Sequence, residues 1–332
     1  MNVPAELQTN LEVPGLAQVF EARQVIYQHL KPTPVLRSIG LSQILGADVY
    51  VKCENLLPTG AFKVRGGLNL ISRLSSQERE RGVITASTGN HGQSVAYAAR
   101  AYGVKAIIGA PIGSNPFKLK AMRDLGAEVV EVGHDFDEAR EWVAQEAGRQ
   151  GYRYIHSANE PLLIAGVATA SLELIEEIPD LEVILVPLGG GSGACGHCIG
   201  AKGVNPHLQV IGVQAEQAPA IYQTFKTGQF SPTATANTFA EGIATRVPFA
   251  LPYKIMTQLL DDIVLVSEEE MRQAICLYLD TLHQLAEGAG AAPLAAALKI
   301  RERLAGKKIA LILSGGNLTT ETLRQILNEP HA

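Results

Sequence analysis

Several features that define other classes of protein are scarce in this sequence. Aromatic residues make up only 5% of the 332 residues, which argues against surfaces that stack on nucleic-acid bases. The formal net charge is -5, so neither nucleic acid nor an anionic membrane is expected as a partner. The four cysteines are too few for a disulfide framework in a chain of this length.

Long apolar runs are also missing. No run approaches the roughly 20 residues that span a membrane, and residues 1–10 lack the basic region and apolar core of a signal peptide. These absences predict a cytoplasmic protein without a membrane partner. What the chain does have is length and 46% hydrophobic residues, which is enough for a large core and about two domains.

Short apolar runs alternate with segments of helical periodicity along most of the chain. This alternation predicts an α/β fold with mostly parallel sheets and helices on both faces. Residues 82–158 contain a complete set of such units and are predicted to form a small mobile domain, with 1–81 plus 159–332 as the large cofactor-binding domain. Helices are predicted over 13–30 and 267–286. Residues 231–246 are polar and irregular, and we expect a loop over a cleft.

One lysine lies in an unusual setting. An apolar strand-like run leads to the turn residues Pro58 and Gly60, and Lys63 follows near a helix start with the apolar neighbours Phe62 and Val64. Such a lysine is either a solvated surface cation or an amine kept partly dry. A desolvated amine is a nucleophile that can form a Schiff base with a carbonyl compound.

Three junctions between a strand and a helix are rich in Gly, Ser, Thr or Asn, at 87–91, 189–194 and 314–317. They are either ordinary turns or binding loops around one cleft, because ligands of open parallel sheets bind beyond the carboxyl ends of the strands. Four glycines in the five positions 189–193 favour close approach of a phosphate to the backbone. The pattern fits neither the dinucleotide fingerprint nor the Walker loop.

The run from Cys195 to Cys198, with Gly and His between, allows two interpretations. The spacing occurs in thiol oxidoreductases, where a helix start acidifies the first thiol. Alternatively, these are small residues that pack a helix behind a phosphate loop. The remaining histidines show no metal-ligand spacing, and no metal site is predicted.

Taken together and in this order, the motifs resemble the fold-type-II pyridoxal-phosphate enzymes, whose fold is like that of the tryptophan synthase β subunit. Within them the chain resembles the serine/threonine dehydratase and serine racemase group, from about Thr33 to Asn317. The resemblance implies pyridoxal 5'-phosphate as cofactor and Lys63 as the residue that forms its Schiff base. It also implies a set of cofactor-binding residues: Phe62 against the ring, Asn90 at the phenolic oxygen, Gly189, Gly190, Gly191, Ser192 and Gly193 around the phosphate, Glu287 near ring and substrate, and Ser314 at the pyridine nitrogen.

The loop at 87–91 resembles the one that binds the substrate carboxylate in this family. The residues implied are Ser87, Thr88, Gly89, Asn90 and His91. Thr88 stands where dehydratases have Ala and racemases have Ser, so a second catalytic role in reprotonation is a hypothesis. Gln214 and Ala220 replace acidic ligands of the family's cation site, with Glu216 as a possible substitute. The phosphate loop has Ser192 where relatives have a fourth consecutive glycine.

The function implied is β-elimination from a β-hydroxy amino acid such as L-threonine or L-serine, releasing a 2-oxo acid and ammonia. A neutral serine at the ring nitrogen suits this reaction better than transamination. The alternatives are a serine racemase, a β-replacement synthase, or a dehydratase for hydroxyaspartate, phenylserine or a hydroxyectoine-derived compound. A non-enzymatic anion-binding protein and a thiol oxidoreductase also remain open. The family expectation for assembly is a homodimer.

Overall fold

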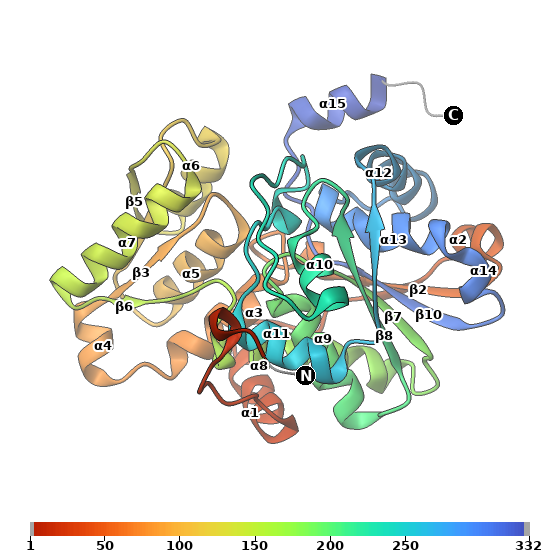
Figure 1. Ribbon diagram of the computed structural model, residues 1–332, viewed down its shortest axis with the longest axis horizontal. Coiled ribbons are helices and arrows are strands. Elements are labelled where there is room, and N and C mark those ends of the chain that lie inside the picture. Colours follow the sequence, from red (N-terminus) through yellow and green to blue (C-terminus); the bar gives the residue numbers. More distant parts are fainter. Residues whose placement is uncertain (1–2, 329–332) are drawn as a thin grey trace.

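The computed structural model describes residues 3–328 and contains two sheets with helices on both sides (Figure 1). The larger sheet has the strand order β1-β2-β10-β7-β8-β9, and only β1 runs antiparallel to its neighbour. Its strands are β1 (Val35–Arg37), β2 (Asp48–Cys53), β7 (Val183–Pro187), β8 (Gln209–Ala215), β9 (Asp262–Val266) and β10 (Lys308–Leu313).

The smaller sheet lies on the left of Figure 1 and is parallel throughout, in the order β5-β4-β3-β6. Its strands are β3 (Val83–Ala86), β4 (Ala106–Ala110), β5 (Glu128–Glu131) and β6 (Arg153–Tyr154). The predicted α/β fold with mostly parallel sheets is confirmed. The assignment of 82–158 as a separate mobile domain stays a prediction.

The central strands are apolar on both faces because helices cover both. In β10, Ile309 and Leu311 belong to one core, and Ala310 and Ile312 belong to the core on the other face. The helices are α1 (Leu16–Ile26), α2 (Ile39–Leu45), α3 (Lys63–Ser72), α4 (Ser76–Arg81), α5 (Asn90–Ala101), α6 (Pro116–Asp124), α7 (Phe136–Gln150), α8 (Pro161–Glu177), α9 (Ser192–Val204), α10 (Ala220–Thr227), α11 (Ala250–Leu259), α12 (Glu268–Leu282), α13 (Gly288–Lys299), α14 (Arg301–Leu304) and α15 (Thr320–Asn328).

Two of the predicted helices are too long. The helix predicted over 13–30 is α1, which begins after Gly15 and ends at Ile26. The helix predicted over 267–286 is α12, which ends at Leu282 because His283 adopts a left-handed conformation with φ 54°. The predicted loop over 231–246 is irregular apart from one short 3-10 turn.

A buried cluster of charges, which we call the charge network, joins β2, α3 and α8. Arg65 donates to both Glu54 and Glu173, and Lys52 donates to Glu173 at 2.6 Å. The hydroxyl of Thr33 donates to Glu54 at 2.6 Å. All of these residues are buried, and the charges of the two cations and two carboxylates cancel. The charge network therefore fixes the helix that starts with Lys63 to the large sheet.

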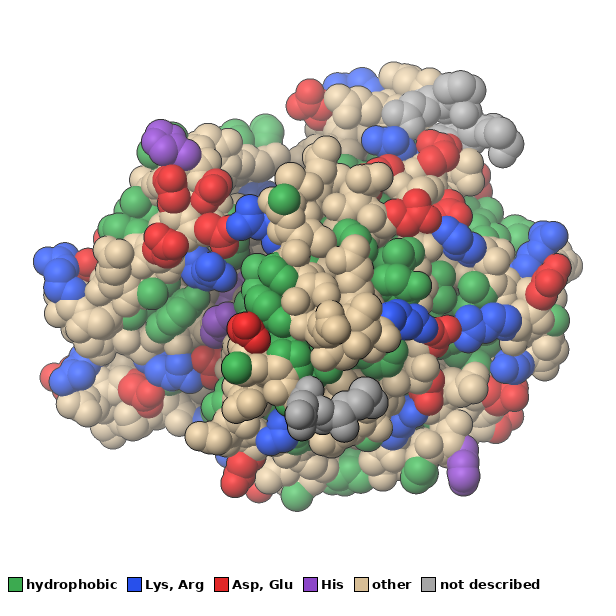
Figure 2. Space-filling view, viewed as in Figure 1, with side chains coloured by type: hydrophobic (Ala, Val, Ile, Leu, Met, Phe, Trp, Pro, Cys, Tyr) green, Lys and Arg blue, Asp and Glu red, His purple; other side chains and the backbone are tan. Residues whose placement is uncertain are grey.

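The charged side chains at the surface are mixed in sign. Figure 2 shows lysines and arginines interspersed with aspartates and glutamates over the visible face. Within residues 3–328, no helix combines the length and apolarity needed to cross a bilayer.

Candidate active site

Three loops meet at one edge of the large sheet because the strands before them are neighbours. β2, β10 and β7 lie side by side and run parallel, so the segments after Cys53, Leu313 and Pro187 emerge together. Backbone bonds join two of the loops, from Phe62 N to Ser314 O and from Gly316 N to Gly60 O, both 2.9 Å. Two of the three predicted binding loops, 189–194 and 314–317, lie at this edge. The third, 87–91, follows β3 of the smaller sheet and reaches the same cleft through Asn90.

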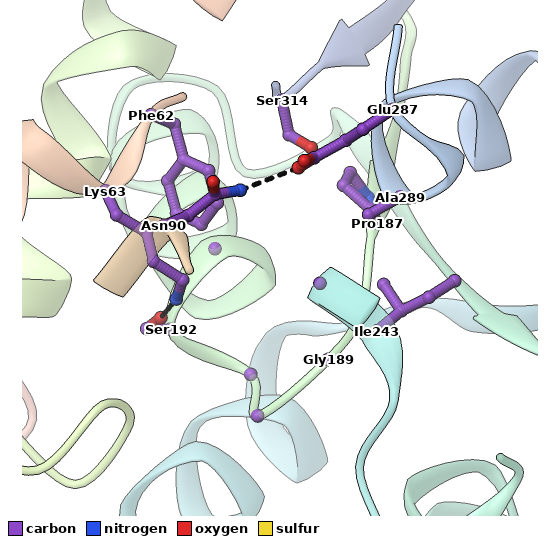
Figure 3. Close-up of a pocket in the computed structure, with 14 residues that line it drawn as sticks. Phe62, Lys63, Asn90, Pro187, Gly189, Ser192, Ile243, Glu287, Ala289 and Ser314 are labelled. Atoms are coloured by element: carbon purple, nitrogen blue, oxygen red, sulfur yellow. Dashed lines mark hydrogen bonds between the residues drawn. The ribbon is translucent and has the colours of Figure 1, made fainter. Parts of the chain in front are cut away.

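A cavity lies between the loops (Figure 3). The structure brings together around it every residue that the resemblance implied for the cofactor. Their individual roles stay predictions. The cavity is lined by Phe62, Lys63, Asn90, Gly189, Gly190, Gly191, Ser192, Gly193, Glu287 and Ser314, and also by Pro187, Gly242, Ile243 and Ala289.

The last four lining residues were not identified from the sequence. Gly242 and Ile243 belong to the irregular segment expected to cover a cleft, but nothing in that segment distinguishes these two from their neighbours. Pro187 and Ala289 flank recognisable motifs. They carry no polar side chain, so only their position in space marks them as part of the wall.

Lys63 is the first residue of α3, and its amine faces the cavity. The amine lies 5.0 Å from the centre of the Phe62 ring and donates to the hydroxyl of Ser192 at 3.4 Å. Burial lowers the pKa of Lys63 from 10.5 to about 8, although the charge of Glu287 acts in the opposite direction. Of the two interpretations left by the sequence, the structure favours a desolvated amine.

The lowered pKa predicts how cofactor capture depends on pH. The neutral amine is the nucleophile, and its fraction rises as pH increases through the pKa of about 8. We therefore expect the rate at which the cofactor-free protein captures pyridoxal phosphate to reach half its plateau near that pH. Borohydride trapping at timed intervals measures this rate. An N-acetyl-lysine amide should show its midpoint near an ordinary lysine pKa of about 10.4, and a coincident midpoint for the protein would contradict the prediction.

The glycine-rich loop between β7 and α9 forms a cradle without side chains. A Cβ at Gly189 would overlap the carbonyl oxygen of Gly242. Gly191 has φ +103°, and a Cβ there would lie 2.6 Å from Pro252. The first bond within α9 runs from Cys195 N to Gly191 O, so the N–H groups before Cys195 in this turn have no helical acceptor. These donors at a positive helix end fit the phosphate of the cofactor.

The side-chain amide of Asn90 is hydrogen-bonded at both its nitrogen and its oxygen. Its nitrogen donates to Glu287 Oε1 at 2.7 Å (Figure 3), and its oxygen accepts from Asn317 Nδ2, also at 2.7 Å. Asn317 donates to Thr59 O as well, at 2.8 Å. Burial raises the pKa of Glu287. Asn317 therefore fixes which end of the Asn90 amide points into the cavity.

Removing the Asn317 side chain is expected to weaken cofactor binding. Asn317→Ala leaves the half-buried Asn90 oxygen without its donor, which costs an amount near the lower end of the about 1–3 kcal/mol lost by a fully buried polar group. We expect the affinity of the cofactor-free protein for pyridoxal phosphate to fall about tenfold, as measured by fluorescence titration. Asn205→Ala is a matched control, because Asn205 caps the exposed N–H of His207. Equal affinity for Asn317→Ala and the wild type would refute this positioning role.

The residues of the loop at 87–91 have different surroundings. Ser87 accepts from the N–H groups of Gly89 and Gly92 and so shapes the turn. Asn90 lines the main cavity, whereas His91 lines a smaller one behind Lys63. Burial, and secondarily the charge of Lys63, lowers the pKa of His91 to about 3, so its imidazole is neutral.

Thr88 does not line the main cavity, as far as residues 3–328 define it, whereas Lys63, the other predicted catalytic residue, does. Thr88 is half-buried. Ser87 N and Gly89 N are already bonded, so the N–H groups of Thr88, Asn90 and His91 remain as donors for a substrate carboxylate. The last two have no helical acceptor, because α5 begins at Asn90 and its first bond is donated by Gln93 N to Gly89 O.

Cys195 and Cys198 pack inside the protein. Both thiols are free and buried, and burial raises the pKa of each. A buried thiol with a raised pKa is unreactive, which supports the packing interpretation over the oxidoreductase one. Glu216 pairs with Lys299 at 3.0 Å. In the described part of the chain, no group of three or more His, Cys, Asp or Glu side chains is arranged to hold a metal ion.

The arrangement defines a class of protein: an α/β enzyme with a desolvated nucleophilic amine beside a phosphate cradle. Comparison with known sequences agrees, because a model of the family described as pyridoxal-phosphate dependent enzymes matches residues 26–315. The chain belongs to this family, and the expected cofactor is confirmed as that of the family.

Three relatives show how the chain lies within the family. It is 38% identical to the L-threonine ammonia-lyase of Thermotoga maritima over 95% of this chain and 78% of the relative. It is 34% identical to the serine racemase of Dictyostelium discoideum over 94% and 98% of the two chains. The structure of threonine deaminase isoform 2 from Solanum lycopersicum superposes with a TM-score of 0.90 at 29% identity, covering 98% of this chain and 92% of that one. The fold-type-II arrangement is confirmed.

Proposed function

We propose that this protein is a pyridoxal-phosphate-dependent ammonia-lyase that converts a β-hydroxy amino acid, such as L-threonine or L-serine, to a 2-oxo acid and ammonia. The observation that carries the proposal is the Lys63 amine, with a pKa lowered to about 8, at the wall of a cavity closed on one side by the glycine cradle. The names of the relatives, threonine ammonia-lyase above all, support the reaction class.

The residues of the cavity fit the cofactor. When bound, pyridoxal phosphate supplies an aldehyde that reacts with amines and a ring that withdraws electrons from the bond being broken. The N–H groups of 189–193 would hold its phosphate, and Phe62 and Asn90 would fix its ring. Ser314 would offer the ring nitrogen a neutral hydroxyl instead of a carboxylate. A neutral partner of this kind would suit loss of a β-substituent better than transamination.

Lys63 is the residue proposed to move protons. When it is free, Lys63 Nζ would take the proton from the substrate Cα. The same nitrogen then returns a proton to the β-hydroxyl oxygen, which leaves as water. The loop at 87–91 binds the substrate carboxylate and so presents the Cα hydrogen to Nζ. The unsaturated amine that is released reacts with water to give the 2-oxo acid and ammonia.

A panel of β-hydroxy amino acids tests this proposal. Purified holoenzyme is incubated with L-threonine, L-serine, hydroxyaspartate and phenylserine, and 2-oxo acid and ammonia are measured together. Equal amounts of the two products from at least one substrate support elimination. The substrate that reacts fastest shows which substrate side chain the pocket accepts best. A purified protein that keeps the yellow colour of bound pyridoxal phosphate but releases neither product would exclude the reaction and leave the cofactor assignment intact.

Racemisation is the second candidate, because a serine racemase is among the relatives and Thr88 supplies a hydroxyl near the substrate loop. Since Thr88 does not form part of the described cavity wall, we expect L-serine to give pyruvate without D-serine. Chiral chromatography of the reaction measures both. D-serine formation that is lost in Thr88→Ala would instead establish Thr88 as the acid on the opposite face.

Three features of the proposal remain. The family resemblance implies a homodimer, the missing signal and membrane segments suggest the cytoplasm, and the alternation of strands and helices suggests that residues 82–158 are a mobile domain. Analytical ultracentrifugation tests the homodimer. Hydrogen exchange with and without a substrate analogue tests the movement, which predicts that protection rises where 82–158 faces the rest of the chain.

A further inference from the structure

Ser192 is the residue of the glycine cradle that carries a polar side chain. It is the first residue of α9 and is buried, with 4% of its surface exposed. It lines both the main cavity and the smaller cavity behind Lys63. Its side chain is therefore at the boundary between the phosphate cradle and the proposed base.

The hydroxyl of Ser192 contacts the Lys63 amine. Lys63 Nζ donates to Ser192 Oγ at 3.4 Å (Figure 3). Within residues 3–328 the amine makes no other hydrogen bond. A hydroxyl has one hydrogen to donate and two lone pairs. After accepting from Lys63, Ser192 still has its hydrogen, which is available to an acceptor in the cradle.

The other groups around the amine do not offer an equivalent contact. Glu287 acts on Lys63 through its charge, but its carboxylate accepts from Asn90. His91 from α5 has a lowered pKa and is neutral. The walls contributed by α8, Leu163 and Val167, are apolar. Ser157 also lines the smaller cavity, but within residues 3–328 the amine's hydrogen bond goes to Ser192 and not to Ser157. Ser192 is thus the polar group placed to hold the amine when it is free.

We propose that Ser192 is a positioning residue for Lys63, and that its hydroxyl holds the free amine at the edge of the phosphate cradle. A glycine at this position would keep the cradle open and leave the amine without a partner. This inference rests on the proposed function, because an amine that never leaves the cofactor needs no second position. The Ser192 hydroxyl connects the phosphate cradle to the Lys63 amine, a contact that a glycine has no side chain to make.

The test compares capture of two probes by cofactor-free, full-length protein. Pyridoxal phosphate reports on amine and cradle together, whereas pyridoxal lacks the phosphate and reports on the amine alone. Borohydride trapping is followed between about pH 6 and about pH 10, a range that brackets the Lys63 pKa. The variants are Ser192→Ala, Ser192→Gly and the hydroxyl-retaining Ser192→Thr. Ser94→Ala is the matched control, because Ser94 bonds to the backbone oxygen of Lys63 at 2.6 Å and not to its amine.

With both probes, Ser192→Ala and Ser192→Gly are expected to show two changes. Loss of an acceptor for the ammonium moves the midpoint a few tenths of a pH unit lower, and loss of positioning lowers the plateau rate about threefold, the effect of one weak hydrogen bond. Ser192→Thr should restore both values, and Ser94→Ala should leave the midpoint unchanged. An effect on pyridoxal phosphate alone, or no effect with either probe, would overturn the proposal. Failure of the wild type to capture either probe would refute the proposed function itself.

Discussion

Replacing Lys63 with Ala is expected to abolish ammonia-lyase activity, with a loss of at least about 10³-fold in kcat/KM, because proton transfer by a positioned side chain alone contributes about 10²- to 10⁴-fold. The same change removes the amine that the cavity desolvates. The variant should still bind pyridoxal phosphate through the cradle, but reversibly. Steady-state release of 2-oxo acid measures the activity, and gel filtration after borohydride treatment measures the lost covalent attachment.

Two further variants separate chemistry from folding. Lys63→Arg keeps a cation in the cavity but provides no nucleophilic amine, so it should be as inactive as Lys63→Ala. Lys120→Ala removes an exposed lysine that pairs with Asp124 on the same helix and should leave activity unchanged. If Lys63→Ala kept more than about a tenth of the wild-type rate, Lys63 could not be the proton carrier.

Replacing Glu173 with Gln is expected to produce the largest loss of stability. Its carboxylate accepts from Lys52 and from two nitrogens of Arg65, and the side chains of all three residues are at most 3% exposed. The substitution leaves the buried cations in excess. Removing one partner of a buried ion pair costs about 3–5 kcal/mol. Denaturant unfolding of the holoenzyme should therefore show a lower midpoint with an unchanged slope.

Glu176 on the same helix provides the control. It pairs with Arg23 at the surface, and its side chain is 58% exposed. Glu176→Gln should change the free energy of unfolding by less than about 0.5 kcal/mol. Similar midpoints for the Glu173 and Glu176 variants would show that the charge network does not stabilise the fold as its burial implies.

The charge network also predicts a dependence of stability on pH. Burial by itself would raise the pKa of Glu54, but the charge and hydrogen bonds of Arg65 outweigh it, so the pKa is lowered. A carboxylate with a lowered pKa in the folded state contributes stability above its ordinary pKa of about 4.3 and loses it as pH falls. The Glu54→Gln variant, which removes this titrating carboxylate, should therefore lose less of its free energy of unfolding between pH 7 and acid pH than the wild type in denaturant titrations.

The sheet strands could be predicted closely from the sequence because local composition determines them. β2, β3 and β10 are examples, since each is an apolar run with turn residues at its end. The junctions after β7 and β10 were recognisable for the same reason. Two parallel strands that end in glycine-rich turns place those turns at one edge of the sheet whatever the intervening chain does.

Other features depend on contacts between residues far apart in the sequence. Lys52 and Glu173 look like surface charges until β2 and α8 bring them together. The hydrogen bonds from Asn317 to Thr59 and Asn90 could not be predicted, because these residues are far apart in the sequence. The sequence predicts no helix where α11 lies, and the Pro252 inside this segment is a residue that breaks most helices. It lies in the first turn, where its missing N–H needs no partner.

The most direct test of the account is to locate the cofactor on the chain. Purified protein is reduced with borohydride, digested, and analysed by mass spectrometry for a pyridoxyl group. The account predicts a single modified peptide that contains Lys63 and is absent from Lys63→Ala. A protein that carries no pyridoxyl group, or carries it on a different lysine, would contradict it.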